Sequence, residues 1–333
     1  MQIGKFNTQK DGVFIIAELS ANHNGSLQIA LDTIKAAKEA GANAVKLQTY
    51  TADTLTIDCD REDFILKGGL WDGQKLYDLY KKAYTPWEWH KELFSYAREL
   101  GLEVFSTPFD KSAVDFLEQF DPVAYKVASF EITDYELVEY IASKKRPMIV
   151  STGVATLEDI KAVVEICKGV PLILLKCTSQ YPAPLEEANL RTITDMKERF
   201  GVEVGFSDHT LGIEAPVVAV SLGAKLIEKH FIMDRSIGGA DSGFSLDKEE
   251  FREMVLAVRK AEKLLGKVDY EPKSGRKWAR SLYVVKPIKK GEIITKEHIR
   301  AIRPGYGLHP KYLSRVIGSK ATRDYQYGEP FVW

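Results

Sequence analysis

The sequence predicts an α/β fold, a (β/α)₈ TIM barrel followed by a small second domain. Short apolar runs alternate eight times with longer segments of helical period. The runs are too uniformly apolar for strands with one face in water, so they are typical of a parallel sheet covered by helices. Eight such units favour a closed barrel, and an open doubly wound sheet is the alternative.

The elements follow one another in a regular order. Runs such as VFIIAELS and PLILLKCTS predict strands at 13–20, 44–50, 103–109, 124–130, 147–153, 171–179, 202–210 and 225–231. Segments such as LEDIKAVVEICKG have the helical period and predict helices at 27–42, 89–102, 111–120, 136–145, 157–169, 189–201, 213–224 and 247–266. Each strand is therefore followed by one helix, as a parallel barrel requires.

The alternation stops after the eighth helix. A polar stretch with Pro and Gly, KVDYEPKSGRK, precedes a segment of short strands and turns. We therefore predict a barrel domain at 1–267, a linker at 268–277 and a small domain at 278–333.

Composition excludes several classes of function. The 333 residues are 45% hydrophobic and carry a formal net charge of −1, so no basic field favours nucleic acid or a membrane surface. No segment has the length of a signal peptide core or a membrane span. Cys59, Cys167 and Cys177 are far apart, which suits reduced thiols. We expect a cytoplasmic protein.

Polar residues gather at the ends of the predicted strands, where barrel enzymes hold their active sites. Taken singly, each is typical of a solvated loop, but eight strands contributing together favour a common site. The set is Glu18, Lys46, Gln48, Thr107, Lys126, Ser129, Glu131, Ser151, Thr152, Lys176, Ser179, Tyr181, Ser207, Asp208, His209, Glu228 and His230.

These residue types suit two kinds of ligand. Lysines and short hydroxyls suit a phosphate group, which carries a charge of about −1.5 to −2 near neutral pH. His209 and His230 end neighbouring strands and could share one metal ion, although either alone is more typical of a packed histidine. A closed structural zinc site would need more protein ligands. An open site for Mn²⁺ or Mg²⁺ is favoured, with Asp241 as an outer partner.

Several motifs together resemble the sialic acid synthase (nonulosonic acid synthase) family, which condenses phosphoenolpyruvate with an N-acetylated sugar aldehyde. They are IIAELSANHNGS, AVKLQTY, FSTPFD, YKVASFE, VSTG, KCTSQYPAP, GFSDHT and EKHF. The resemblance covers the barrel from about Gly12 to Leu265. The stretch PIKKGEIITKEHIRAIRPGYG is similar to the antifreeze-like (SAF) domain at the C-terminus of these synthases.

The resemblance implies roles for individual residues. It implies a divalent metal held by His209 and His230, with Mn²⁺ expected and Mg²⁺ or Co²⁺ as alternatives, and a catalytic set of Glu18, Glu131 and the two histidines. The residues that it implies for binding phosphoenolpyruvate are Lys46, Thr107, Lys126, Ser129, Ser151 and Ser207. The residues that it implies for binding the acceptor sugar are Gln48, Phe109, Ser179, Tyr181, Asp241 and Arg303.

Two stretches of the sequence narrow the choice of acceptor sugar. N-acetylneuraminate synthases commonly have Asn where this chain has Ser179. Residues 68–90 resemble the pseudaminic acid branch of the family, whose acceptor is a 6-deoxy sugar with two acetamido groups. Trp71, Tyr77 and Tyr84 could line an apolar subsite there, or pack between helices. Legionaminate and N-acetylneuraminate synthases are the alternatives within the family.

The resemblance also implies an assembly. The expected partners are phosphoenolpyruvate and an N-acetylated amino sugar, with no nucleic acid and no membrane. A domain-swapped homodimer is expected, in which Arg303 of one chain reaches the acceptor in the partner's barrel. The rival from another class is a non-catalytic carbohydrate-binding protein, which would have no need of Glu18, two lysines and two histidines together.

Overall fold

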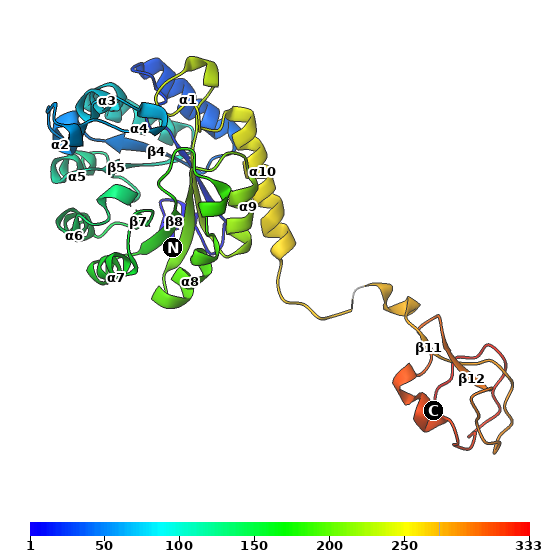
Figure 1. Cartoon of the computed structure of the whole chain (residues 1–333). Helices are drawn as coiled ribbons and strands as arrows, with labels where there is room; N and C mark the ends of the chain where they lie inside the picture. The colour runs from blue at the N-terminus through cyan, green and yellow to red at the C-terminus, as the bar shows by residue number, and fades with distance from the viewer. Residues whose placement is uncertain (273) are drawn as a thin grey trace. The chain divides into compact units, whose positions relative to one another are not determined.

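The computed structural model describes residues 1–272 and 274–333. The chain forms two compact units, Met1–Gly266 and Lys267–Trp333, each described by itself below (Figure 1). No helix among the described residues has both the length and the apolar character needed to cross a membrane.

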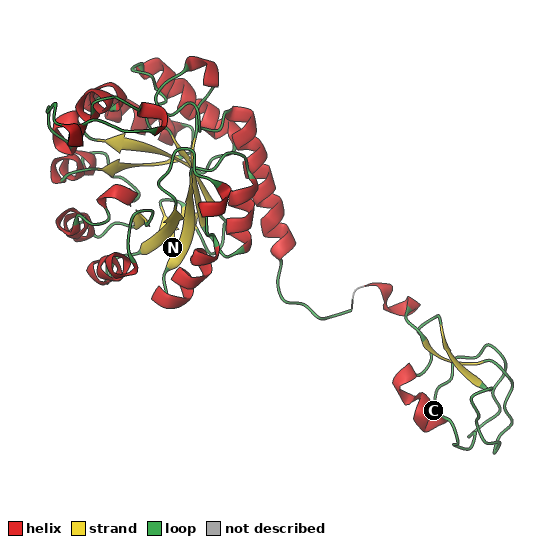
Figure 2. Cartoon of the chain, viewed as in Figure 1, coloured by secondary structure: helices red, strands yellow, loops and turns green. Residues whose placement is uncertain are grey.

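Eight parallel strands close into a barrel at the centre of the first unit, with helices around them (Figure 2). Their order around the barrel is β10, β3, β4, β5, β6, β7, β8 and β9. The bounds are β3 (Phe14–Glu18), β4 (Ala44–Thr49), β5 (Glu103–Pro108), β6 (Tyr125–Val127), β7 (Met148–Ser151), β8 (Leu172–Cys177), β9 (Glu203–Asp208) and β10 (Leu226–His230). The predicted barrel is confirmed, and the open sheet is excluded because β10 pairs with both β9 and β3.

One long helix follows each strand and buries an apolar face against the barrel. These helices are α1 (Leu27–Ala40), α4 (His90–Glu99), α5 (Lys111–Glu118), α6 (Tyr135–Ser143), α7 (Leu157–Ile166), α8 (Arg191–Phe200), α9 (Glu214–Ser221) and α10 (Lys248–Leu265). Side-chain caps begin several of them: Asp110 accepts from the backbone of α5, and Thr156 and Asp247 close capping boxes on α7 and α10. All eight predicted helices occur.

Period-two alternation sorts the strand residues into two cores. Residues such as Ile15, Val45 and Leu174 face the helices, and their neighbours such as Ile16, Ala44 and Ile173 fill the lower lumen. The lumen is therefore apolar towards the N-terminal ends of the strands.

A short hairpin that the sequence did not predict covers this apolar end. It consists of β1 (Gln2–Ile3) and β2 (Phe6–Asn7). Ile3 is fully buried in the lumen cluster, and the Phe6 ring lies 4.9 Å from that of Phe14. Glu203 accepts hydrogen bonds from Thr8 and from the Met1 ammonium, which ties the hairpin to β9. The floor of the barrel is thus closed.

A long connection between β4 and α4 also went unpredicted. It contains α2 (Ala52–Leu55), α3 (Leu76–Ala83) and three 3₁₀ turns, η1 (Glu62–Phe64), η2 (Gly69–Trp71) and η3 (Trp87–Trp89). Connections in α/β units usually have about 2–6 residues, so this excursion is an addition to the fold.

The second unit has its own small core. Antiparallel β11 (Ser281–Val284) and β12 (Ile299–Ile302) pack with η8 (Pro310–Tyr312) and α11 (Leu313–Val316) around residues such as Leu282, Val316 and Phe331. A 3₁₀ turn, η7 (Ser274–Trp278), lies at the end of the predicted linker 268–277. Lys273, within that linker, lies outside the described residues.

Candidate active site

Polar side chains replace apolar ones in the upper lumen, towards the C-terminal ends of the strands. The alternation that buries Ile16 and Ala44 in the floor brings Glu18 and Lys46, two residues further on, into the lumen side by side. The same step carries Lys126, Ser151, Cys177, Ser207 and Glu228 into it from five other strands. These members of the predicted ring therefore surround one space, whereas Asp208 and Lys176 lie on the other face of their strands, where Asp208 pairs with Lys229 and Lys176 donates to Thr178.

Two lysines and two glutamates form a buried charge cluster there. Lys46 Nζ lies 2.6 Å from Glu18 Oε2 and 3.9 Å from Glu228 Oε1. Lys126 Nζ lies 3.7 Å from the same Glu228 oxygen. None of the four residues is more than 5% exposed. Buried charges are costly unless they are paired, and Glu228, which lies near both lysines, compensates part of their charge.

Burial shifts the protonation of this cluster. Burial, helped by the charge of Glu228 and opposed by Lys46, raises the pKa of Glu18 to about 7. Burial raises the pKa of Glu228, but the charges of Lys126 and Lys46 outweigh it and leave that pKa below its usual value. Burial also lowers the pKa of Lys126. Glu228 is thus the carboxylate that stays ionised beside the lysines.

Hydroxyl groups complete a donor-rich pocket around the two ammonium groups. Lys126 Nζ donates to Ser151 Oγ at 2.7 Å, and Lys46 Nζ donates to Thr107 Oγ1 at 3.2 Å. Ser207 Oγ donates to Glu228 Oε1 at 3.1 Å. An incoming anion can replace such internal acceptors with charge-assisted hydrogen bonds of its own.

Gly153 allows three of the strand-end loops to converge. A Cβ atom at this position would lie 2.2 Å from Ser179 Oγ and 2.7 Å from Ser129 Oγ. The Gly153 amide donates to Ser129 Oγ at 3.0 Å, which holds η4 (Ser129–Glu131) against β7. The sequence analysis quoted this glycine within VSTG but gave it no role; the close approach depends on three-dimensional packing.

His209 and His230 lie side by side at the rim of the lumen. Their ring centroids are 5.4 Å apart. His209 Nδ1 donates to the Thr178 carbonyl at 2.9 Å, which leaves Nε2 without a proton when the ring is neutral. His230 Nδ1 is buried and has no hydrogen-bond partner among the described residues, and burial together with the charge of His209 lowers the pKa of His230 well below the usual value.

This histidine pair fits a divalent metal ion. A neutral imidazole whose second nitrogen is held by a carbonyl is the usual form of a metal ligand. Among residues 1–272 and 274–333, no three His, Cys, Asp or Glu side chains are grouped to hold a metal together. Asp241 Oδ2 lies 3.9 Å from His230 Nδ1. The donor set therefore suits an open site, in which water and substrate supply most ligands.

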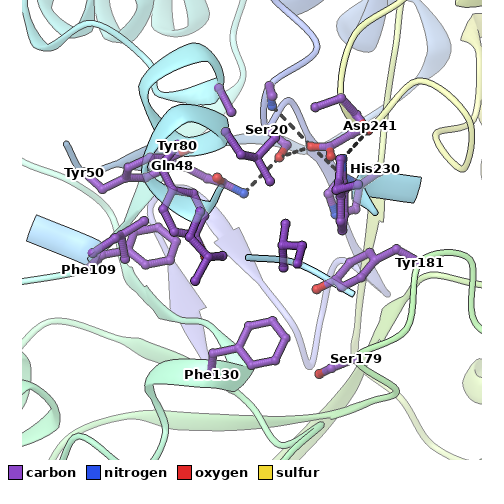
Figure 3. A pocket seen from close by; sticks show the side chains of 18 of the residues that line it. Ser20, Gln48, Tyr50, Tyr80, Phe109, Phe130, Ser179, Tyr181, His230 and Asp241 are labelled. Atoms are coloured by element: carbon purple, nitrogen blue, oxygen red, sulfur yellow. Dashed lines mark hydrogen bonds and ion pairs between the residues drawn. The ribbon is translucent and has the colours of Figure 1, made fainter. Parts of the chain in front are cut away.

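A cavity of about 420 Å³ opens above the charge cluster (Figure 3). Its polar lining comes from Ser20, Gln48, Glu131, Ser179, Tyr181, His230 and Asp241. Glu131 Oε2 is buried and, in the part of the chain that the structure describes, has no hydrogen-bond partner; burial, opposed by Lys126, raises the pKa of Glu131 to about 7. A carboxyl group with such a pKa can exchange protons near neutral pH.

The excursion between β4 and α4 supplies an apolar wall to the cavity. Its lining residues are Leu55, Leu66, Trp71, Leu76, Leu79, Tyr80 and Ala83. Trp71 Nε1 donates to the Ala240 carbonyl at 3.3 Å, which links the excursion to the loop after β10. The proposed lining by Tyr77 and Tyr84 is wrong: neither lines the cavity, and Tyr77 instead donates to Asp53 at 3.2 Å.

The other residues predicted to hold an acceptor sugar also lie around this cavity, except one. Gln48 Nε2 donates to Glu18 Oε1 at 2.9 Å and to Ser20 Oγ at 3.0 Å. Ser20 Oγ donates to Asp241 Oδ2 at 2.5 Å. The Tyr181 ring lies 4.3 Å from that of His209, and Phe109 packs on Tyr50. Arg303 belongs to the second unit, where it is exposed after β12.

Sequence reasoning missed several contributors to this site. Glu228 was recognised only as a strand-end residue, and Gly153, Ser20 and Tyr80 were given no role. Glu228 had a usable signal, because a glutamate two residues before His230 must face the lumen with it. The excursion carries no comparable periodic signal.

Comparisons with known proteins identify relatives over the whole chain. The sequence model of the NeuB family matches residues 33–270, and that of the SAF domain matches residues 279–333. A pseudaminic acid synthase of Campylobacter jejuni (strain 81-176) is 55% identical over 336 residues, covering 99% of this chain and 98% of the relative. One from Helicobacter pylori is 45% identical over 317 residues, covering 93% of each.

A solved structure also resembles this one. The N-acetylneuraminic acid synthetase of Leptospira borgpetersenii, determined in complex with citrate, is 31% identical and superposes with a TM-score of 0.74. The match covers 83% of this chain and 93% of that one.

Proposed function

The chain belongs to the NeuB family, and from this we propose that it is a pseudaminic acid synthase. It would condense phosphoenolpyruvate with 2,4-diacetamido-2,4,6-trideoxy-β-L-altropyranose and water to give pseudaminic acid and phosphate. The observation that carries the proposal is a lumen with two buried lysines beneath an apolar cavity wall. A polyanion suits the lower part, and an amino sugar with methyl groups suits the upper part.

Phosphoenolpyruvate is assigned to the charge cluster. Its phosphate suits Lys126 with Ser129, Ser151 and Ser207, and its carboxylate suits Lys46 with Thr107. Lys126 already donates to Ser151, so the ammonium and the hydroxyl are held together before the ligand arrives. Such preorganised donors stabilise charge that moves during reaction by several kcal/mol in typical enzymes.

Lys126→Ala should raise the KM for phosphoenolpyruvate by about 10–100-fold, since a hydrogen bond to a charged group contributes about 1.5–3 kcal/mol. Phosphate release at varied phosphoenolpyruvate concentration measures this. The matched control is Lys168→Ala, which removes a surface lysine that pairs with Glu165. If the kinetic constants for phosphoenolpyruvate were unchanged in both Lys46→Ala and Lys126→Ala, the assignment of phosphoenolpyruvate to this cluster would be wrong.

We assign a divalent ion, Mn²⁺ before Mg²⁺ or Co²⁺, to His209 and His230. When bound, such an ion supplies Lewis acidity towards a carbonyl oxygen. Thr178 and the lumen wall orient the two imidazoles for it. The unpartnered His230 Nδ1 supports the assignment, because a buried ring nitrogen without a partner costs free energy that a ligand can offset.

The two glutamates with raised pKa values are assigned to proton transfer. Carbon 3 of phosphoenolpyruvate forms a bond to the aldehyde carbon, and Glu18 in its neutral form gives a proton to the aldehyde oxygen. Water then adds at carbon 2 and gives a proton to ionised Glu131. The bond between carbon 2 and the phosphate oxygen then breaks, the new hydroxyl on carbon 2 becomes the carbonyl group of the product, and its proton passes to the departing phosphate. Both carboxyl groups have pKa values of about 7, so each is available in both forms at neutral pH.

The apolar wall favours a 6-deoxy acceptor. Leu66, Trp71 and Leu79 line the cavity together with its polar residues. A methyl group in place of a hydroxymethyl group, and the methyls of two acetamido groups, can be buried there without leaving a hydroxyl unpaired.

Turnover with a panel of acceptor sugars tests the function. Phosphate release should be fastest with the 2,4-diacetamido-2,4,6-trideoxy sugar, and N-acetylmannosamine should react about 100-fold less efficiently, the range of selectivity that one apolar subsite gives. A clear preference for N-acetylmannosamine, or for the legionaminate precursor, would contradict the pseudaminate assignment. Absence of phosphate release with every acceptor would favour the non-catalytic carbohydrate-binding protein.

We further propose that the active form is a domain-swapped homodimer, with Arg303 of one subunit reaching the acceptor held by the other. Residues 267–333 contain 15 Lys and Arg against 6 Asp and Glu, a formal charge of +9, so the remaining 266 residues carry −10. Opposite charges of this size support docking of the small unit on a barrel. Hydrogen bonds from Ser281 Oγ to the Pro304 carbonyl and from the Gly307 amide to Ser281 Oγ hold the loop beside Arg303.

Mixed dimers test this assembly. Arg303→Ala and Lys46→Ala chains should each be weak alone, but together they should recover about a quarter of wild-type activity. Random pairing makes half of the dimers mixed, and each mixed dimer has one site with both residues intact. No recovery in dimers shown to be mixed, or full activity in a monomer, would refute the shared site.

A further inference from the structure

A second buried ion pair lies behind the histidines, on the opposite side of the strands from the cavity. Asp208 ends β9 and Lys229 lies in β10, and each is 1% exposed. Their side chains point towards the helix layer, because the neighbouring Ser207 and Glu228 occupy the lumen. Neither residue lines the cavity or belongs to the charge cluster of Lys46 and Lys126.

Lys229 and Asp208 bracket His209. Lys229 Nζ donates to Asp208 Oδ2 at 2.5 Å and to the Thr210 carbonyl at 2.6 Å. Asp208 Oδ1 accepts from the Thr210 amide at 2.8 Å. The residues before and after His209 are thus fixed to one ammonium group, so the path of the backbone through His209 is determined from outside the lumen.

The pair also sits where the β9–β10 ladder ends. Lys229 and Asp208 are the last residues of the two strands to stand opposite each other, and the next residue on each strand is a histidine. Beyond this point β9 has ended, and His230, the last residue of β10, pairs with Glu18 of β3. The separation of the two imidazoles therefore depends on how firmly this last step is held.

A contribution to folding stability does not by itself explain why Asp208 and Lys229 form a buried ion pair. Apolar residues of similar size often serve as well or better, since both charges must be removed from water. A metal site with two protein ligands depends strongly on the spacing of its two imidazoles, because no further protein ligand can compensate for an error in that spacing. Preorganisation of the ligands therefore contributes more to metal affinity in such a site.

We propose that Asp208 and Lys229 are positioning residues, which hold His209 at the spacing from His230 that a divalent ion requires. They touch neither substrate nor metal and act through the backbone of residues 208–210. The proposal rests on the metal assignment made above. It predicts a defect in metal affinity that is separable from phosphoenolpyruvate binding and from folding.

Two neutral double variants test the proposal. In Asp208→Asn/Lys229→Met the asparagine can still accept from the Thr210 amide, but the donor to the Thr210 carbonyl is absent. In Asp208→Asn/Lys229→Gln a side-chain amide donor is restored. Neither variant leaves a buried charge unpaired. Mn²⁺ dissociation constants come from the electron paramagnetic resonance of the free ion, and phosphoenolpyruvate binding to the metal-free protein comes from calorimetry.

The methionine double variant should bind Mn²⁺ about 10–100-fold more weakly than wild type, the usual effect of losing a group that orients a metal ligand. The glutamine double variant should recover at least part of the affinity, and phosphoenolpyruvate binding should change less than twofold in both. Glu118→Gln/Arg146→Met, at an ion pair beside the opposite ends of the strands, is the matched control and should bind Mn²⁺ normally.

Equal Mn²⁺ affinity in wild type and the methionine double variant would overturn the proposal. So would a matching loss of phosphoenolpyruvate binding, or failure of both double variants to fold, because each would make the pair a general structural element. If the wild type itself did not bind Mn²⁺, the metal assignment would be at fault, which distinguishes that failure from the failure of this inference.

Discussion

Replacing His230 by alanine is expected to reduce kcat/KM by about 10³-fold, and His209→Ala should do the same. The loss of a Lewis acid removes several kcal/mol of transition-state stabilisation, and each 1.36 kcal/mol corresponds to a factor of ten. The measurement is phosphate release after chelator treatment, with and without added Mn²⁺. Wild type should lose activity on chelation and regain it with Mn²⁺, whereas neither variant should respond.

The control for this prediction is His309→Ala, since His309 is an exposed histidine of the second unit. It should behave as wild type in both conditions. Near-normal turnover of either lumen variant after chelation would show that the paired imidazoles serve another purpose.

Replacing Glu131 by glutamine is expected to lower kcat by about 10²–10⁴-fold, the usual contribution of a general base. The kcat of the wild type should also fall as the pH is lowered. Because burial raises the pKa of Glu131 to about 7, the group is protonated at lower pH and cannot accept a proton from water. The rate should therefore decline as pH falls below about 7, and it should also decline above about 7, where the proton donor Glu18 ionises, which gives a bell-shaped profile.

The matched control is Glu136→Gln, a glutamate nearby in the chain whose exposed side chain pairs with Lys111. Its pH profile should equal that of wild type. An acid limb that persists unchanged in Glu131→Gln would assign the acceptance of the proton from water to another group.

Much of the barrel and its lumen could be predicted because strands obey a short period. In LILLKC the residues that face the helices and those that face the lumen alternate, so the orientation of a residue near a strand end follows from counting. His209 and His230 could be paired because consecutive strands of such a barrel are neighbours. These inferences needed no knowledge of loops.

The remaining features depend on contacts between distant parts of the chain. The hydrogen bond from Trp71 to Ala240 joins residues 169 positions apart, and no local pattern marks it. Tyr77 is an aromatic residue of the kind that could line an apolar subsite, but its hydroxyl donates to Asp53 instead. The importance of Glu228 follows from its distances to lysines on two other strands. Each strand of the N-terminal hairpin has only two residues, too few for a periodic signal.

The closed floor of the barrel constrains the order of events. With Ile3 buried among the lower lumen side chains, the N-terminal end of the barrel is closed, so under the proposed function both reactants would enter and both products would leave through the cavity at the other end. The lysine cluster lies deeper than the apolar wall. A sugar seated against Trp71 and Leu79 would stand in the path to Lys126, so the smaller, anionic reactant must be in place first. Steady-state kinetics would describe the enzyme as an ordered sequential system, with the depth of each subsite setting the sequence.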